Sequence, residues 1–167
     1  MTETITIEKM LDEDWPDVKA IFQEGIDGGN ATFFTHTPNW EEWNEGHLKF
    51  ARFVAKLNNE IVGWIALSPF SGRDFHSGVV EDSIYLSEKA QGKGIGSKLL
   101  AACIEDAEQN NIWLIQSQIF VENIGSIKLH EKFGFYSVGI RKKIGKHNGI
   151  WRDVLLMDRR SDIVGID

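Results

Sequence analysis

The sequence predicts a mixed α/β fold in which helices pack on both faces of one sheet. Segments with the alternating pattern of strands and segments with the helical 3.6-residue period follow one another along the chain, which is typical of layered folds. The length of 167 residues suits a single core, and 42% hydrophobic with 26% charged residues is an ordinary globular composition. We therefore interpret residues 1–167 as one domain.

The N-terminal region predicts a strand and then a helix. Residues 4–8 alternate polar and apolar side chains, as a strand with one buried face does. Acidic residues at 12–14 and Pro16 are typical of a helix N-terminus, and the glycines at 28–29 end the helix. The apolar face of this helix consists of Val18, Ile21, Phe22 and Ile26.

A loop, a second helix and a hairpin are expected next. Residues 31–38 have the character of a loop, and the aromatic-rich segment 40–50 predicts a helix. Two strands, Phe53–Leu57 and Ile61–Leu67, flank a polar turn at 58–60.

The second half predicts alternating strands and helices. A connection at 69–78 leads to a strand at 79–86, and a polar loop at 87–92 leads to a helix from Ile95. The apolar stripe of this helix is Ile95, Leu99, Leu100, Cys103, Ile104 and Ala107. The remaining expected elements are a strand at 113–120, a helix at 126–132 and closing strands at 135–140 and 151–157.

The segment Gln91–Ser97 places three alternate glycines where the loop enters the helix. Glycines allow a sharp turn and close approach to backbone N–H groups, which are unpaired at a helix N-terminus and suit a pyrophosphate. A P-loop is disfavoured because no Gly-Lys-Ser/Thr ending follows. A dinucleotide fingerprint is disfavoured because the glycine spacing differs and the next strand offers Gln116 and Gln118 instead of an acid. A glycine-rich helix entry without a ligand is the alternative.

Two blocks of sequence resemble the GNAT superfamily of N-acetyltransferases. Gln91–Ser97 resembles its acyl-CoA pyrophosphate loop, Gln/Arg-x-x-Gly-x-Gly/Ala, and Glu122–Phe135 is similar to a later motif with an Asn, a small residue and a closing Gly-Phe. The segments similar to the phosphinothricin and methionine sulfoximine acetyltransferase branch are Asn30–Phe33 with Pro38, Pro69-Phe70, Val80–Leu86 and Trp151–Val154. The resemblance implies a GNAT-like, mostly antiparallel central sheet with helices on both faces, and acetyl-CoA as acetyl donor without a metal.

The resemblance also implies a cofactor site along one strand and the loop after it. The residues matched to that site are Ile84, Tyr85, Leu86, Gln91, Gly92, Lys93, Gly94, Ile95, Gly96, Ser97 and Asn123. An ordinary capping role is the alternative for Asn123. Lys93 and Lys98 could add charge beside the phosphates, although exposed helix lysines are commonly only solvated.

Acetyl transfer to an amine needs a base for the substrate ammonium and a proton for the departing thiolate. Glu81 matches the general base of the branch, with an ordinary ion pair as the alternative. His130 stands where many superfamily members have a Tyr proposed to protonate the thiolate and where the branch commonly has His, with a satisfied histidine on a helix flank as the alternative. Asp82 departs from the branch, which tends to have His there. Cys103 lies on an apolar stripe, which disfavours a covalent acetyl-cysteine route.

The connection before the strand at 79–86 matches the acceptor site of the branch. The residues assigned to substrate binding are Phe33, Ser71, Gly72, Arg73, Glu81, Asp82 and Ser83, with Phe34 and Phe75 as further apolar walls. The Arg73 guanidinium can bind a carboxylate through two hydrogen bonds, with an ordinary place on a surface loop as the alternative. The expected acceptor is the α-amine of a small amino-acid analogue, namely phosphinothricin, methionine sulfoximine or methionine sulfone. The alternatives are another amine, such as a peptide N-terminus or a polyamine, and a non-catalytic acyl-CoA-binding module.

The net charge of −7 argues against nucleic acid or an anionic membrane as a partner. One cysteine permits no internal disulfide, and neither a signal peptide nor a membrane-length apolar run is apparent, so we expect a cytoplasmic protein. The basic run Arg141–Lys143 with Lys146 and His147 is interpreted as a solvated edge at a turn that could reach the adenosine phosphate or a partner subunit. A homodimer is expected from the resemblance.

Overall fold

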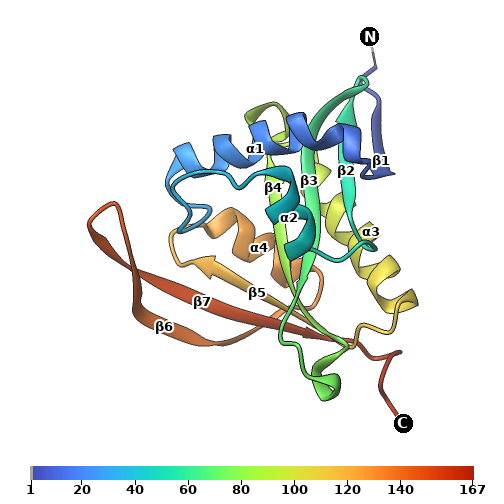
Figure 1. Cartoon of the computed structure of the whole chain (residues 1–167), viewed down its shortest axis with the longest axis vertical. Coiled ribbons are helices and arrows are strands. Elements are labelled where there is room, and N and C mark those ends of the chain that lie inside the picture. Colours follow the sequence, from blue (N-terminus) through green and yellow to red (C-terminus); the bar gives the residue numbers. More distant parts are fainter. Residues whose placement is uncertain (1) are drawn as a thin grey trace.

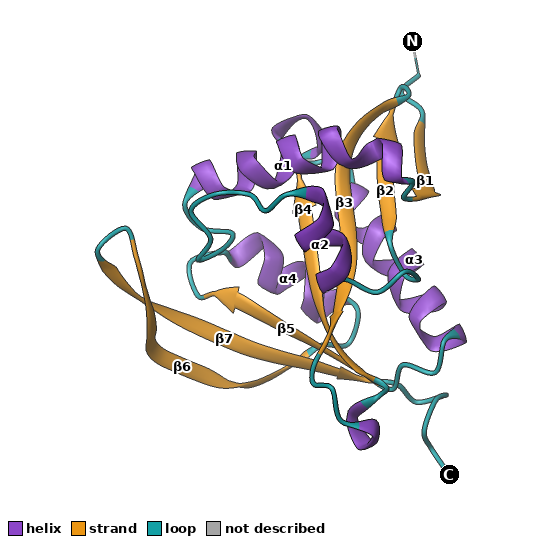
Figure 2. Cartoon of the chain, viewed as in Figure 1, coloured by secondary structure: helices purple, strands orange, loops and turns teal. Residues whose placement is uncertain are grey.

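A computed structural model describes residues 2–167 as one seven-stranded sheet with helices on both faces (Figures 1 and 2). The strand order across the sheet is β1-β2-β3-β4-β5-β7-β6. The strands are β1 (Ile5–Lys9), β2 (Phe53–Leu57), β3 (Glu60–Pro69), β4 (Val79–Leu86), β5 (Leu114–Phe120), β6 (Tyr136–His147) and β7 (Ile150–Arg160). The helices are α1 (Trp15–Gly28), α2 (Trp40–Gly46), α3 (Ile95–Gln109) and α4 (Ile124–Lys132).

Alternating side chains of the central strands divide the core into two layers. Trp64 and Ala66 of β3 face α1 and α2, and belong to a cluster with Val18, Phe22 and Trp43. Ile65 and Leu67 face the opposite way and pack with the apolar stripe of α3. Cys103 lies in this second layer with no exposed surface, and burial raises the pKa of its thiol well above the ordinary value. The prediction that Cys103 is a core residue is therefore confirmed.

The sheet opens between β4 and β5. These strands pair in parallel over only three positions, from Val79 with Leu114 to Glu81 with Gln116, whereas every other neighbouring pair is antiparallel. Beyond Glu81 the two strands diverge (Figure 1). The predicted mixed, mostly antiparallel sheet is confirmed, and the divergence exposes one edge of β4.

Helix α2 is shorter than predicted. It ends at Gly46 instead of continuing to residue 50, because His47 has an extended backbone and the N–H of Leu48 donates to the carbonyl of Leu67 at 2.8 Å. Tertiary hydrogen bonding with β3 therefore overrides the aromatic pattern of this segment.

The C-terminal hairpin is longer than predicted. Strand β6 runs to His147 and β7 begins at Ile150, so the basic run lies within a strand and not at a turn. The turn itself is at Asn148 and Gly149, both with positive φ, as a tight hairpin connection requires. Apolar residues alternate only in the first half of β6, at Tyr136, Val138 and Ile140, and the basic run that follows shows no such pattern. None of the helices within residues 2–167 has the length and apolar composition needed to span a membrane.

Candidate active site

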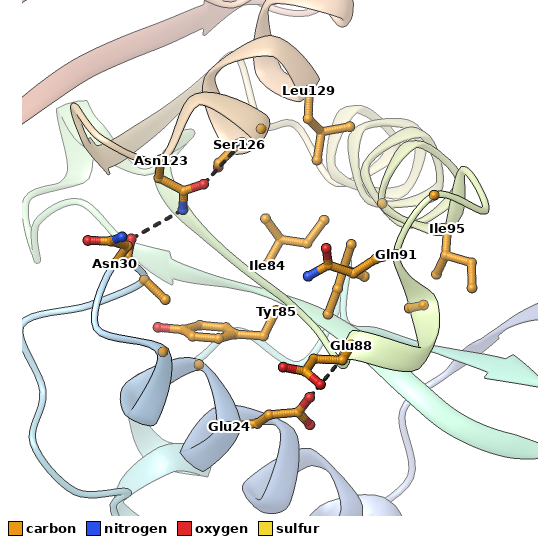
Figure 3. A pocket seen from close by; sticks show the side chains of 18 of the residues that line it. Glu24, Asn30, Ile84, Tyr85, Glu88, Gln91, Ile95, Asn123, Ser126 and Leu129 are labelled. Atoms are coloured by element: carbon orange, nitrogen blue, oxygen red, sulfur yellow. Dashed lines mark hydrogen bonds between the residues drawn. The ribbon is translucent and has the colours of Figure 1, made fainter.

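A cavity of about 730 Å³ lies at the opening between the diverging strands. Its walls come from the C-terminal end of α1, the end of β4, the loop into α3 and the start of α4 (Figure 3). Ten of the eleven residues matched to a cofactor site line it, and Lys93 is the exception. The Nζ of Lys93 instead contacts the carboxylate of Glu3 at 2.8 Å.

The glycine-rich loop presents backbone donors to this cavity. Gly92 and Gly94 have φ of 71° and 72°, a left-handed conformation that other residues adopt at a cost. The first helical hydrogen bond of α3 runs from Lys98 N–H to the carbonyl of Gly94, so the amides of residues 95–97 have no acceptor in the preceding turn. These amides and the partial positive charge of the helix N-terminus can bind an anion.

The free edge of β4 forms a second wall. Ile84 to Leu86 pair with β3 on one side, while on the other side β5 has already separated. Tyr85 stacks on Trp64 and Phe22, with ring centroids 4.8 and 4.9 Å apart. Burial raises the pKa of Tyr85 to about 12, although a hydrogen bond with Thr32 acts in the opposite direction. Tyr85 therefore remains a neutral, fixed wall of the cavity.

Asn123 is the N-cap of α4. Its Oδ1 accepts a hydrogen bond from the N–H of Ser126 at 3.3 Å, and its Nδ2 donates to the carbonyl of Asn30 at 3.3 Å (Figure 3). Asn123 therefore caps α4, as the alternative predicted, and it also lines the cavity. Asn123 links α4 to the loop after α1.

Glu81 lies where β4 and β5 separate. Its Oε1 accepts hydrogen bonds from the side-chain amides of Gln116 at 3.1 Å and Gln118 at 2.6 Å. Glu81 forms no ion pair with any residue in the described range 2–167, which disfavours the ion-pair alternative. In the sequence, these two glutamines served only to disfavour a dinucleotide-binding site, and their contact with Glu81 was not predicted. Their polar side chains alternate with buried Ile115 and Ile119, a signal that they share one face of β5.

Asp82 and His130 form a buried pair on the opposite face of β4 from Glu81. Oδ2 of Asp82 is 2.7 Å from Nε2 of His130, and each side chain is 1% exposed. Nδ1 of His130 donates to the carbonyl of Ser126 at 2.7 Å, and Ser117 Oγ lies 3.2 Å from Nε2. Burial favours a lower pKa for His130, but the charge and hydrogen bond of Asp82 prevail and raise it. Asp82, predicted to bind substrate, is therefore engaged with His130.

The residues predicted to bind the acceptor substrate do not all lie together. Ser71 Oγ contacts Nδ1 of His76 at 2.9 Å, and the N–H of Arg73 donates to Ser71 Oγ at 3.3 Å. The Arg73 guanidinium lies 5.8 Å from the ring of exposed Phe75. This connection, which includes Gly72, precedes β4, so it lies at the opposite end of that strand from the glycine-rich loop.

The other predicted acceptor residues lie along or beside the opened sheet. Phe33 packs edge-on against Phe120 of β5 at 4.7 Å, whereas Phe34 lies against Phe22 of α1. Ser83 pairs with Ala66 of β3. It is two residues beyond Glu81 on β4 and therefore lies on the same face of that strand.

Arg152 is a site residue that the residue-by-residue reasoning missed. Its Nη1 donates to the carbonyl of Gly29 at 2.9 Å, and its Nη2 donates to Oδ1 of Asn30 at 2.7 Å and to Glu122 at 3.1 Å. The guanidinium also lies 4.0 Å from the ring centroid of Phe120. Arg152 of β7 therefore links the wall that follows α1 to the wall that precedes α4.

Comparison with known proteins gives a consistent result. The chain matches the acetyltransferase (GNAT) family over residues 7–135. It is 30% identical to a phosphinothricin N-acetyltransferase of Streptomyces coelicolor over 95% of this chain and 97% of that one. It is 28% identical to an L-methionine sulfoximine/L-methionine sulfone acetyltransferase of Pseudomonas paraeruginosa, over 89% and 90% of the two chains.

A solved structure shows the same architecture. The crystal structure of a GNAT superfamily phosphinothricin acetyltransferase from Sinorhizobium meliloti, in complex with AcCoA, has a TM-score of 0.88 to this chain. The two are 27% identical over 98% of this chain and 92% of that one. The opened sheet, the glycine-rich helix entry and these similarities agree: the chain belongs to the acetyltransferase (GNAT) family.

Proposed function

We propose that the protein transfers an acetyl group from acetyl-CoA to the α-amine of a small amino-acid analogue such as phosphinothricin, methionine sulfoximine or methionine sulfone. The observation that carries the proposal is the position of Glu81, held by two glutamine amides where β4 and β5 separate, on the strand that leads to the glycine-rich loop. The names of the similar proteins support this class of acceptor.

The cavity fits acetyl-CoA in shape and chemistry. The amides at the start of α3 would bind the pyrophosphate, and the free edge of β4 at Ile84–Leu86 would bind the amides of the pantetheine arm. At about 3.3 Å per strand residue, Leu86 is roughly 16 Å from Glu81, a distance that an extended pantetheine arm spans. The acetyl group would then lie near Glu81.

Glu81 acts as the general base in this proposal. Gln116 and Gln118 both donate to Oε1, whereas Oε2 has no hydrogen bond within residues 2–167 and is free to receive a proton from the substrate ammonium. The neutral amine then attacks the thioester carbonyl, which a backbone N–H of Ile84–Leu86 polarises, and the carbon–sulfur bond breaks as the amide forms.

His130 supplies the proton for the leaving thiolate by way of Ser126. The ring of His130 is buried and both nitrogens already have acceptors, so it does not itself line the cavity. Ser126 does line the cavity, and its hydroxyl lies 3.4 Å from Nδ1 of His130. Proton transfer through this hydroxyl would connect the buried histidine to the reacting atoms.

Ser71, Gly72 and Arg73 are proposed as acceptor contacts, together with the aromatic wall at Phe33. The proposal also includes a cytoplasmic homodimer. Support for a dimer comes from the exposed apolar side chains of the β6–β7 hairpin, which are Val138, Ile140, Ile144, Ile150 and Trp151. Sedimentation of the purified chain would test the dimer.

The proposed function is tested with a panel of amines incubated with acetyl-CoA while free CoA thiol is recorded. We expect thiol release with phosphinothricin, methionine sulfoximine or methionine sulfone. A polyamine and a peptide with a free N-terminus serve as alternative acceptors. Release with those two alone would overturn the proposed substrate class, and the absence of any thermal shift at saturating acetyl-CoA would overturn the proposed donor.

A further inference from the structure

A row of polar side chains crosses the open face of the sheet from Glu81 to Arg141. Nε2 of Gln118 donates to Oε1 of Glu81 at 2.6 Å, and Oε1 of Gln118 accepts a hydrogen bond from Nη1 of Arg141 at 3.0 Å. The amide of Gln118 is thus oriented by a carboxylate at one end and a guanidinium at the other. A positive group is held at a fixed spacing from the proposed base.

The strand register explains how Arg141 reaches this position from the outermost strand. Gln118 of β5 pairs with Leu156 of β7, which in turn pairs with Gly139 of β6. Arg141 is two residues beyond Gly139 and therefore points to the same face of the sheet. Gly139 adds no side chain to that row, so Leu156 is the side chain of the row that the guanidinium passes as it extends over β7.

Arg141 has no acidic partner within residues 2–167. Arg52, Arg152 and Arg159 each form an ion pair with a carboxylate. Arg160 donates to backbone carbonyls near the C-terminus, and Arg73 faces the ring of Phe75. Arg141 uses Nη1 in one hydrogen bond to a neutral amide and is otherwise exposed, so its remaining N–H donors are available to an anion.

The spacing of the two charges suits the head group of an α-amino acid. Two hydrogen bonds and the width of one amide separate Glu81 Oε1 from Arg141 Nη1 by at most about 8 Å. An α-amino acid that donates from its ammonium to one side and accepts at its carboxylate from the other spans a similar distance. Such a substrate would lie beside the Gln118 amide, with its ammonium at Oε2 of Glu81 and its carboxylate at the remaining N–H donors of Arg141.

We infer that Arg141 binds the α-carboxylate of the acceptor and that Gln118 holds its guanidinium in register with Glu81. The inference rests on the proposed function and specifies it further, because it makes a free α-carboxylate the recognised feature. It differs from the carboxylate-binding role that the sequence suggested for Arg73, whose guanidinium makes no hydrogen bond to the residues around Glu81.

The test compares L-methionine sulfone with its α-carboxamide as acceptors, using acetyl-CoA as donor. The variants are Arg141→Gln, Arg141→Lys, Arg73→Gln and, as a matched control, Lys142→Gln, which removes one charge from an exposed neighbour on β6. We expect the wild type to favour the acid. Arg141→Gln should raise KM for the acid by about 10- to 100-fold, the effect of losing a charged hydrogen bond, and should leave the carboxamide and acetyl-CoA nearly unaffected. Arg141→Lys should restore part of the preference.

Three results would overturn the inference. Arg141→Gln could retain the wild-type preference for the acid, it could weaken the acid and the carboxamide equally, or Arg73→Gln alone could abolish the preference. In each case the wild type is active, so the proposed function stands. If the wild type acetylates neither acceptor while acetyl-CoA still raises its melting temperature, the amino-acid acceptor and the inference fail together.

Discussion

Oδ2 of Asp82 lies 2.7 Å from Nε2 of His130 in the interior of the protein, and this contact joins β4 to α4 across the opening of the sheet. The carbonyl of Ser126 can only accept, so Nδ1 of His130 carries a proton while Nε2 faces a carboxylate. The arrangement is that of an imidazolium with two acceptors. It fixes α4, and with it the cap of Asn123, against the strand that holds Glu81.

The first prediction concerns Asp82→Asn. Removing one charge of a buried pair should lower the free energy of unfolding by about 3 kcal/mol. The pKa of His130 is raised in the folded state, so this stabilisation is fully present below pH 6.5 and is lost as pH rises through the folded-state pKa. Chemical denaturation from pH 5.5 to 9 should therefore show the wild type and the variant converging at high pH.

A matched control for Asp82→Asn is Asp74→Asn in the connection before β4, where the side chain is exposed. It should leave both the stability and its pH dependence nearly unchanged. If the free energies of unfolding of the wild type and Asp82→Asn differ by the same amount across this pH range, the pair is not an imidazolium with a carboxylate.

The second prediction concerns Gly94, whose φ of 72° starts α3. A Cβ at this position meets nothing within 4 Å, so any cost is conformational and not steric. Gly94→Val should cost about 1–2 kcal/mol and reduce the thermal stabilisation by acetyl-CoA, because the loop amides would move apart. Gly94→Asn should retain most of both properties, since Asn tolerates a left-handed backbone. Equal behaviour of the two variants would argue against a conformational role.

The third prediction concerns Glu81→Gln. A glutamine is nearly isosteric but cannot take the ammonium proton, so kcat should fall by about 10²- to 10⁴-fold. The thermal shift with acetyl-CoA should be preserved, because Glu81 does not line the donor cavity. Steady-state kinetics and a melting curve check these two expectations, and full activity in the variant would remove Glu81 as the base.

The order of elements and the glycine-rich loop could be predicted from local patterns, whereas the cavity residues Ile84–Leu86 and Asn123 were assigned only through the family resemblance. The stripe of α3, the alternation of β3 and the glycines at 92, 94 and 96 each have a short-range physical cause. Contacts between distant segments could not be predicted in this way. Gln118 and Arg141 are 23 residues apart, and only the strand order β5-β7-β6 brings them together.

Asp82 shows a different limit of sequence reasoning. Its place beside Glu81 suggested a substrate contact, but neighbouring strand residues point to opposite faces, and only the packing of α4 shows which face receives His130. The full length of β6 could not be predicted either. Its apolar alternation ends at Ile140, and the exposed second half continues as a strand because it pairs with β7.

The last prediction concerns Arg152, which donates to Gly29, Asn30 and Glu122 and lies over Phe120. Arg152→Lys keeps the charge but cannot reach three acceptors, so we expect a loss of about 2 kcal/mol in stability and a higher KM for acetyl-CoA at unchanged kcat. The pKa of the Glu122 carboxyl is lowered mainly by a hydrogen bond from the backbone N–H of Glu122 and next by the hydrogen bond from Arg152. The stabilisation that Glu122 contributes is therefore lost as pH falls below 4.5. Lys142→Gln serves as the control, and a KM for acetyl-CoA equal to that of the wild type would show that Arg152 does not position the cavity walls.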